Sequence, residues 1–141
     1  MSYLLDTCII SELVRPSPDN SVLRWIDSRN EFDLYLSVLT LGEIQKGIAK
    51  LSSGKKKSLL AAWLKDELVV RFEERIIPVN SGVAMMWGTM LGKAEKNGQP
   101  LSAIDALIAA TAKMYDLVVV TRNVRDMEVS GVDILNPWEA P

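Results

Sequence analysis

The chain has 141 residues, a hydrophobic fraction of 48% and a formal net charge of −2 at pH 7. We expect one domain over residues 1–141, with a core large enough to fold without disulfides, and not a uniformly basic nucleic-acid binder. The sequence contains no histidine, which excludes Ser-His-Asp and Cys-His catalysis and histidine-based metal sites. Hydrolytic chemistry would therefore depend on carboxylates, together with a hard cation such as Mg²⁺ or Mn²⁺.

Short apolar segments alternate with helical patterns along the whole chain. This alternation favours an α/β fold with a mostly parallel sheet covered by helices on both faces. Within it, we expect the fully apolar segment 117–121 to be central and the alanine-rich helix 102–116 to be the most buried. The expected strands are 3–6, 33–37, 75–79 and 117–121, and the segment 132–138 gives a last short strand and a Pro-Trp ending. The expected helices are 8–14, 21–30, 40–51, 58–72, 81–98 and 102–116.

Turn and capping residues set the expected boundaries of these elements. Asn30 is placed to close the second helix, and the polar, basic segment 52–58 is interpreted as a connection between helices. Pro16 and Pro18 stop the first helix, because proline removes a backbone donor and clashes with the preceding turn.

Acidic side chains lie close to the ends of the expected strands, where open α/β sheets bind their ligands. Asp6 ends the first strand, and Glu43 lies in the first turn of the helix after the second strand. Asp105 lies in the first turn of the alanine-rich helix, and Asn123 and Asp126 follow the strand at 117–121. If the strand before Asp6 and the strand at 117–121 are neighbours, these acids converge on one crevice.

Each acid also has a purely structural interpretation. Segments 40–43 and 102–105 both match the capping-box pattern, and Asp6 can cap the helix that follows it. Asp126 can be a solvated loop residue. Asp6 nevertheless follows apolar residues and Asp105 lies in a segment with little other charge, and buried unpaired carboxylates tend to coordinate a cation. Capping and cation binding do not exclude each other.

Other chemistries that begin with an aspartate fit poorly. Aspartyl-phosphate phosphatases need a second aspartate two residues later, and Cys8 occupies that position. Two-component receivers need an acidic pair after the first strand, which is absent here. A cysteine phosphatase loop needs five residues between cysteine and arginine, whereas six separate Cys8 from Arg15.

Four short blocks, "LLDTCIISEL", "SVLTLGEIQKGI", "SAIDALIAATA" and "VVVTRNVRDM", resemble the signature blocks of PIN-domain ribonucleases. The sequence is similar to VapC-type toxins of bacterial toxin–antitoxin pairs, particularly their FitB-like branch, over nearly the whole chain. The resemblance implies a three-layer α/β/α sandwich with a central, mostly parallel sheet. It also implies acidic residues that bind Mg²⁺ or Mn²⁺ and endonucleolytic cleavage of RNA.

The resemblance, applied to each of the four blocks, implies which residues form the active site. Asp6, Glu43 and Asp105 match the first three acids of the family, and Asp126 matches a later acid. These residues would bind one or two metal ions and activate water for attack on the phosphate. Three polar residues would position water or phosphate, and they are Thr7, Thr121 and Asn123.

Basic side chains near these acids are candidates for RNA binding, since a cluster of carboxylates needs nearby cations to tolerate phosphate. The candidates are Lys46, Lys50, Arg122 and Arg125, whereas Lys55–Lys57 fits a solvated turn better. Cys8 departs from the asparagine that is commoner after "DT" in this family. We interpret it as a small buried apolar residue whose thiol replaces an amide beside Asp6.

The resemblance further implies a homodimer, a cognate antitoxin that inhibits the active site, and contact with promoter DNA only through that antitoxin. An alternative function is a non-catalytic module that acts mainly within such a complex. Trp25, Trp63 and Trp87 could form partner surfaces, although core packing is the default interpretation. A single cysteine, no signal peptide at residues 1–30 and no apolar run of membrane-spanning length favour a cytoplasmic protein that does not enter a membrane.

Overall fold

The computed structural model describes residues 1–139. A five-stranded sheet with the order β3-β2-β1-β4-β5 runs through the molecule, and each neighbouring pair is parallel. This arrangement confirms the expected α/β fold with a parallel sheet. The strands are β1 (Tyr3–Leu5), β2 (Leu34–Ser37), β3 (Ile76–Ile77), β4 (Val118–Val120) and β5 (Ile134–Leu135).

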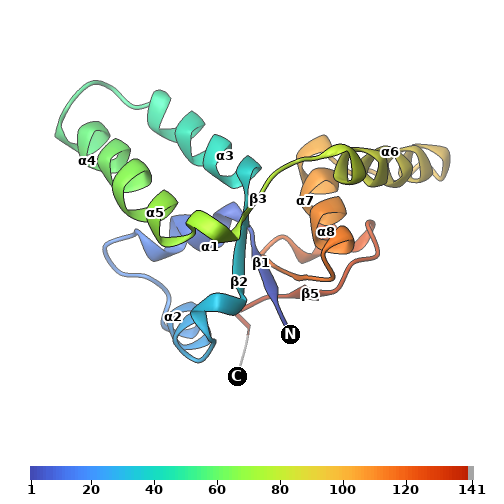
Figure 1. The fold of residues 1–141 in the computed structure, drawn as a ribbon, viewed down its shortest axis with the longest axis horizontal. Helices are drawn as coiled ribbons and strands as arrows, with labels where there is room; N and C mark the ends of the chain where they lie inside the picture. Colours follow the sequence, from blue (N-terminus) through green and yellow to red (C-terminus); the bar gives the residue numbers. More distant parts are fainter. Residues whose placement is uncertain (140–141) are drawn as a thin grey trace.

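Helices flank the sheet on both sides, and they form two groups that are consecutive in sequence (Figure 1). The first group is α1 (Thr7–Leu13), α2 (Asn20–Asp27), α3 (Val38–Ala49), α4 (Lys55–Trp63) and α5 (Val69–Arg71). The second group is α6 (Ser81–Lys96), α7 (Ala103–Met114) and α8 (Val124–Glu128). Short helical turns lie at η1 (Glu31–Asp33), at the π-helical η2 (Leu64–Leu68) and at η3 (Glu73–Arg75). No helix within residues 1–139 is long and apolar enough to cross a membrane.

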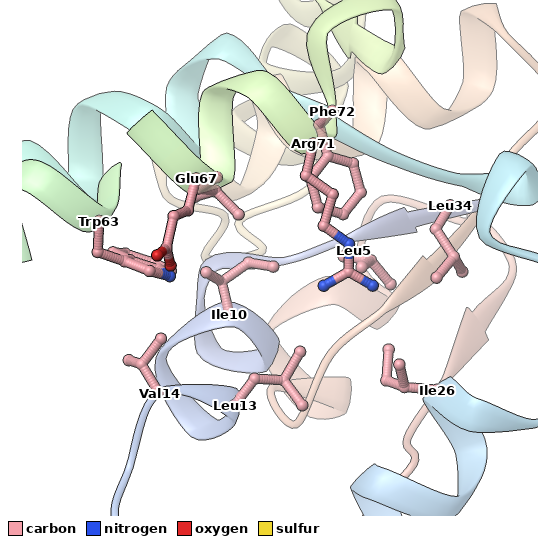
Figure 2. A pocket seen from close by; sticks show the side chains of 11 residues that line it. Leu5, Ile10, Leu13, Val14, Ile26, Leu34, Trp63, Glu67, Arg71 and Phe72 are labelled. Atoms are coloured by element: carbon pink, nitrogen blue, oxygen red, sulfur yellow. The ribbon is translucent and has the colours of Figure 1, made fainter. Parts of the chain in front are cut away.

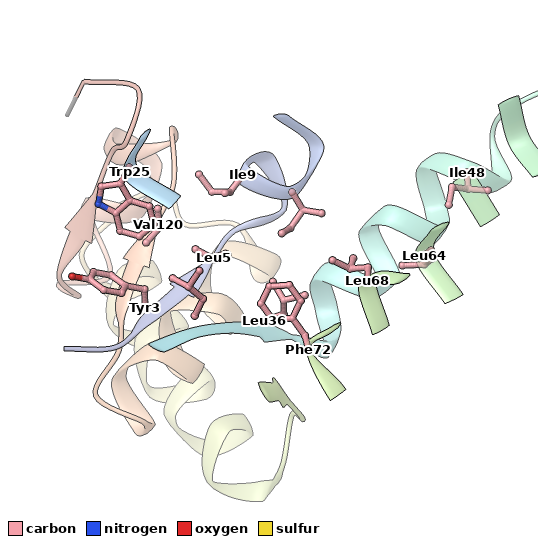
Figure 3. Packing of buried hydrophobic residues seen from close by; sticks show 12 residues of the cluster. Tyr3, Leu5, Ile9, Trp25, Leu36, Ile48, Leu64, Leu68, Phe72 and Val120 are labelled. Atoms are coloured by element: carbon pink, nitrogen blue, oxygen red, sulfur yellow. The ribbon is translucent and has the colours of Figure 1, made fainter. Parts of the chain in front are cut away.

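Successive residues of each strand point to opposite faces of the sheet, which divides the core into two clusters. Leu5 and Val120 belong to the cluster beneath the first group of helices, together with Trp25 and Phe72 (Figure 3). Leu4, in contrast, belongs to the cluster beneath α6, α7 and α8. Both faces of the sheet are therefore covered, as the continuous apolar runs in its strands require.

The alanine-rich helix α7 is the most buried helix of the described chain, as the sequence predicts. Six of its residues are buried, namely Ala106, Ile108, Ala109, Ala110, Thr111 and Ala112. The expectation of a central strand at 117–121 holds only in part. β4 is an interior strand, paired with β1 and β5, but the middle position of the sheet belongs to β1.

Several expected boundaries are wrong, and two of them have a clear local cause. Helix α2 ends at Asp27 and not at Asn30, whose side chain instead accepts the N–H of Phe32 and caps η1. The segment at 52–58 is not wholly a connection, because α4 begins at Lys55. The basic run Lys55–Lys57 thus occupies a first helical turn, where positive charge opposes the helix dipole. Packing of the remainder of α4–η2–α5 against the core overrides this local preference.

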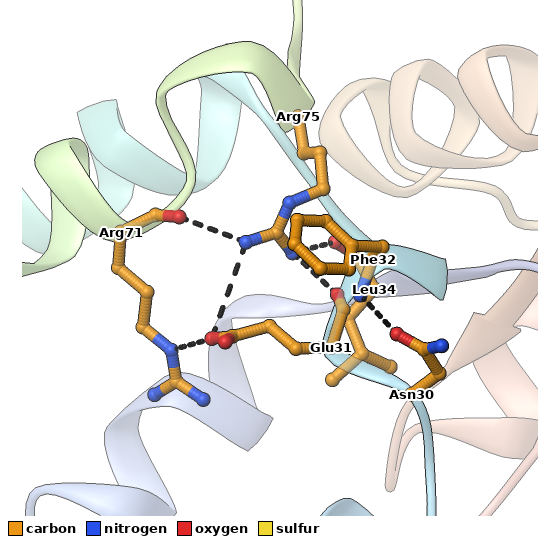
Figure 4. Close-up of polar contacts among 6 residues, drawn as sticks. All are labelled: Asn30, Glu31, Phe32, Leu34, Arg71 and Arg75. Atoms are coloured by element: carbon orange, nitrogen blue, oxygen red, sulfur yellow. Dashed lines mark hydrogen bonds and ion pairs between the residues drawn. The ribbon is translucent and has the colours of Figure 1, made fainter.

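Arg75, at the end of η3, ties the first group of helices to the start of β2 (Figure 4). Its guanidinium donates hydrogen bonds to the carbonyl oxygens of Glu31 (2.6 Å), Leu34 (2.6 Å) and Arg71 (2.8 Å). The same guanidinium lies 4.7 Å from the centroid of the Phe72 ring. A single charged side chain thus satisfies three carbonyls at a point where two chain segments meet.

Candidate active site

Asp6 lies at the junction of β1 and α1, and its carboxylate is held from two sides. One oxygen accepts the backbone N–H of Thr7 at 2.8 Å, so Asp6 is the N-cap of α1. The other accepts the hydroxyl of Thr121 at 2.8 Å. Thr121 follows β4, which pairs with β1, so the expected adjacency of these two strands is confirmed. Asp6 is only 7% exposed, yet Oδ1 keeps a lone pair for a further ligand.

Glu43 lies opposite Asp6 on α3, and it is not part of a capping box. The N-cap of α3 is Ser37, whose hydroxyl accepts the N–H of Leu39 at 3.1 Å, while Thr40 is buried inside the helix. Glu43 therefore lies in the second turn and is free of any capping role. Its carboxylate accepts the hydroxyl of Thr7 at 2.6 Å, so Thr7 connects both acids.

Asp105 lies in the first turn of α7, where the predicted cap is present. The hydroxyl of Ser102 accepts the N–H of Asp105 at 3.1 Å. The carboxylate of Asp105 forms no hydrogen bond or ion pair with the residues that the structure describes, which leaves it available. The negative charges of Glu43 and Asp105 both raise the pKa of Asp6. The fold therefore brings these three acids into electrostatic contact.

The pKa of Asp6 is raised from its ordinary value near 3.8, and burial of the carboxylate is the largest cause. The hydrogen bonds from Thr121 and Thr7 oppose the shift, whereas the charges of Glu43 and Asp105 add to it. No lysine or arginine contributes to this balance. Negative charge therefore accumulates at this site without a compensating cation from the protein.

The raised pKa predicts how stability depends on pH. The folded chain retains the Asp6 proton at pH values where the unfolded chain has lost it, so the free energy of unfolding falls as pH rises from 3.8 through the folded pKa. Asp6→Asn removes this pH-dependent loss of stability, because asparagine does not ionise. We therefore expect the stability advantage of Asp6→Asn over the wild type to grow as the pH rises above 3.8, measured by urea unfolding in EDTA. An advantage that does not change with pH would contradict this origin.

The remaining polar candidates lie further out. Asn123 precedes α8, and its backbone N–H donates to the Thr121 hydroxyl at 3.0 Å, which orients the hydroxyl that holds Asp6. Asp126 is exposed on α8 and is not among the charges that act on Asp6. Within residues 1–139, no group of three or more acidic or cysteine side chains is arranged so that it could hold a metal ion as it stands. Threonine hydroxyls donate to Asp6 and Glu43, whereas the Asp105 carboxylate has no such partner among the described residues.

The hydroxyls of Thr7 and Thr121 both donate to carboxylates. Their expected role in positioning water or phosphate stays a prediction. Cys8 is half-buried, with its sulfur 4.0 Å from the Asp6 carboxylate and 3.6 Å from the Thr121 hydroxyl. Burial raises the pKa of the Cys8 thiol. The thiol therefore stays protonated at neutral pH, consistent with a packing residue beside Asp6.

The basic candidates differ in how firmly they are held. Lys46, Lys50 and Arg125 are exposed. The Arg122 guanidinium, in contrast, lies 4.6 Å from the centroid of the Trp138 ring. Trp138 is not among the expected site residues, because no local pattern of the sequence specifies its contact with Arg122.

Two apolar hollows lie on the face covered by the first group of helices. A groove of about 250 Å³ runs between α1, α3 and α4, and its lining includes Thr7 and Glu43. A cavity of about 210 Å³ lies between α1, α2, η2 and α5. Glu67 and Arg71 are the charged side chains in its otherwise apolar lining (Figure 2). Trp63 borders both hollows, while Trp25 is a core residue, as the default interpretation predicted.

Comparison with known proteins gives consistent matches. The PIN domain family matches residues 3–130. Toxin FitB of Neisseria gonorrhoeae is 39% identical over 96% of this chain and 97% of its own length. VapC ribonuclease Y4jK of Sinorhizobium fredii is 35% identical over 96% and 97%. A solved structure of FitAB bound to an IR36 DNA fragment has a TM-score of 0.92, at 37% identity over 99% of this chain and 97% of that one. The chain therefore belongs to the PIN-domain family, in its branch of VapC- and FitB-type ribonuclease toxins.

Proposed function

We propose that this protein is a Mg²⁺- or Mn²⁺-dependent endoribonuclease that uses Asp6, Glu43 and Asp105 as its metal-binding and catalytic acids. The observation that carries the proposal is the buried Asp6 carboxylate, which faces two further acids and has no basic partner. Carboxylate oxygens are the ligands that small hard cations prefer, so the residues present fit such an ion. When bound, the metal would lower the pKa of a water molecule and polarise the scissile phosphate.

The protein's own residues prepare this chemistry before any substrate arrives. Thr121 and the Thr7 backbone fix the orientation of Asp6, and the Thr7 hydroxyl fixes Glu43. A carboxylate held in this way can also accept the proton of the attacking water. Asp126 would lie at the rim, where it can supplement the three inner acids. Arg122, Arg125, Lys46 and Lys50 would bind the RNA backbone around the acids.

Partner binding follows from the same assignment. We propose that the chain is the toxin of a type II toxin–antitoxin pair in the cytoplasm, that it forms a homodimer, and that a cognate antitoxin inhibits it. The apolar groove whose lining includes Thr7 and Glu43 supports binding of an inhibitory protein segment at this place. The structure of FitAB bound to an IR36 DNA fragment supports contact of the toxin–antitoxin complex with DNA, and we propose that this contact is to promoter DNA through the antitoxin. A module that acts only within such a complex is the second candidate, and nuclease assays distinguish the two.

The test is cleavage of RNA by the purified chain without its antitoxin. We expect internal cleavage of single-stranded RNA in Mg²⁺ or Mn²⁺, no cleavage in EDTA, and recovery when the metal is restored. Asp105→Asn should abolish cleavage while preserving the Ser102 cap, because the cap uses the backbone N–H of residue 105. Asp133→Asn is the matched control at an exposed position outside the proposed site, and it should retain full activity. Metal-independent cleavage, or full activity of Asp105→Asn, would contradict the proposal.

A further inference from the structure

The segment after β5 folds back on the molecule and fixes Trp138 in place. The Asn136 side chain accepts the N–H of Trp138 at 3.0 Å, and the Ser21 hydroxyl on α2 donates to the Pro137 carbonyl at 2.8 Å. Pro137 is buried, and the Trp138 indole packs against the first core cluster. Trp138 is therefore a rigid surface and not a loose terminal side chain.

Arg122 is the side chain that rests on this surface. It directly follows Thr121, whose hydroxyl holds Asp6, so its backbone lies at the edge of the acidic site. Its guanidinium carbon lies 4.6 Å from the centroid of the Trp138 ring. Within residues 1–139 Arg122 forms no ion pair, and its side chain is exposed. Contact with the ring face leaves the N–H groups at the edge of the guanidinium plane free to bind an anion.

We propose that Trp138 is a positioning residue that holds Arg122 ready to bind an RNA phosphate beside the catalytic acids. This inference rests on the proposed ribonuclease function and adds a specific phosphate contact to it. A free arginine side chain loses rotamer entropy when it binds, and a ring that restricts it beforehand reduces that loss. Within residues 1–139, Lys46, Lys50 and Arg125 do not lie over an aromatic ring, so Arg122 would be the preorganised cation among the four.

The test measures binding of a fluorescein-labelled single-stranded RNA by anisotropy over a range of salt concentrations, in the non-cleaving Asp105→Asn background. Trp138→Leu should weaken binding by about two- to fivefold, the effect of one exposed cation–π contact. It should leave the salt dependence unchanged, because the charge of Arg122 remains. Arg122→Gln should weaken binding and make the slope of log K against log[salt] shallower by about 0.7, as expected for one lost phosphate contact on a single strand.

Combining the substitutions separates positioning from direct contact. If Trp138 acts only through Arg122, the double variant binds no more weakly than Arg122→Gln alone. Additive effects would show that the indole contacts RNA independently and would overturn the proposal. So would a Trp138→Leu variant that binds as tightly as the background.

Two conservative variants test the proposal even if Trp138→Leu does not fold. Trp138→Phe keeps a ring in the same place and should restore most of the affinity. Arg122→Lys keeps the charge but loses the planar group, so it should weaken binding with an unchanged salt slope. Unchanged affinity of Arg122→Lys would also overturn the proposal.

A matched control comes from the opposite end of the sheet. Arg29 also lies over aromatic rings, 5.6 Å from the centroid of Tyr3 and 5.3 Å from that of Trp25. Tyr3 begins β1, whereas Asp6 follows its end, so Arg29→Gln should leave RNA binding unchanged. RNA cleavage by the wild-type chain is measured in parallel. Its absence would overturn the proposed function and this inference together, whereas cleavage with an inert Trp138 would overturn this inference alone.

Discussion

Asp6→Asn is expected to lower RNA cleavage by at least about a hundredfold, since loss of even an outer partner of a metal ligand costs about 10- to 100-fold. The substitution removes the negative charge at the most buried acid of the site. It can keep the local structure, because asparagine caps helices as well as aspartate and its amide can still pair with Thr7 N–H and the Thr121 hydroxyl. The measurement is the rate of RNA cleavage at saturating Mg²⁺.

Stability measurements separate loss of chemistry from loss of fold. In metal-free buffer we expect Asp6→Asn to unfold at the same temperature as the wild type or higher, because a buried charge beside two like charges is removed. Mg²⁺ should raise the unfolding temperature of the wild type, since a ligand that binds only the folded state stabilises it. That increase should be smaller in Asp6→Asn. Full cleavage activity in this variant would remove Asp6 from the proposed site.

Arg75→Ala is expected to destabilise the fold by about 2–4 kcal/mol, because hydrogen bonds from charged donors are worth about 1.5–3 kcal/mol each and some of the released carbonyls can bind water. The Arg75 side chain is 11% exposed, and its loss removes one charged donor from each of three carbonyls (Figure 4). It also uncovers the Phe72 ring in the core. Urea unfolding followed by circular dichroism measures the change.

Arg71→Ala is the matched control for Arg75. Arg71 lies in the same group of contacts, but it pairs with the Glu31 carboxylate at the surface, with 52% of its side chain exposed. The Arg71 hydrogen bond lowers the pKa of Glu31, yet exposed ion pairs contribute only about 0–1 kcal/mol. We therefore expect a small effect of Arg71→Ala that shrinks further in high salt. Equal losses in the two variants would contradict the assigned role of the three carbonyls.

Much of the fold can be predicted from the sequence, because the periodicity of hydrophobic residues and the positions of turn and capping residues determine local secondary structure. The apolar run before Asp6 and the alanine-rich pattern of 102–116 identify a buried strand and a buried helix without any tertiary information. Boundaries were less accurate. Asn30 caps the next helical turn instead of closing α2, and Ser37, not Thr40, caps α3. Neighbouring polar residues can all serve as caps, and the packing of the helix decides among them.

The sequence by itself determined that this protein would be a parallel α/β fold with acids placed after its strands, and that its chemistry could not use histidine. Only the tertiary structure decided which acids meet. The pairing of β1 with β4 brings Thr121 to Asp6 across 115 positions of sequence. The start of α3 at Val38 places Glu43 beside Thr7. Asp126 stays exposed on α8, and Arg122 meets Trp138 only because the chain folds back after β5. These contacts depend on strand order and helix packing, which no local pattern of residues specifies.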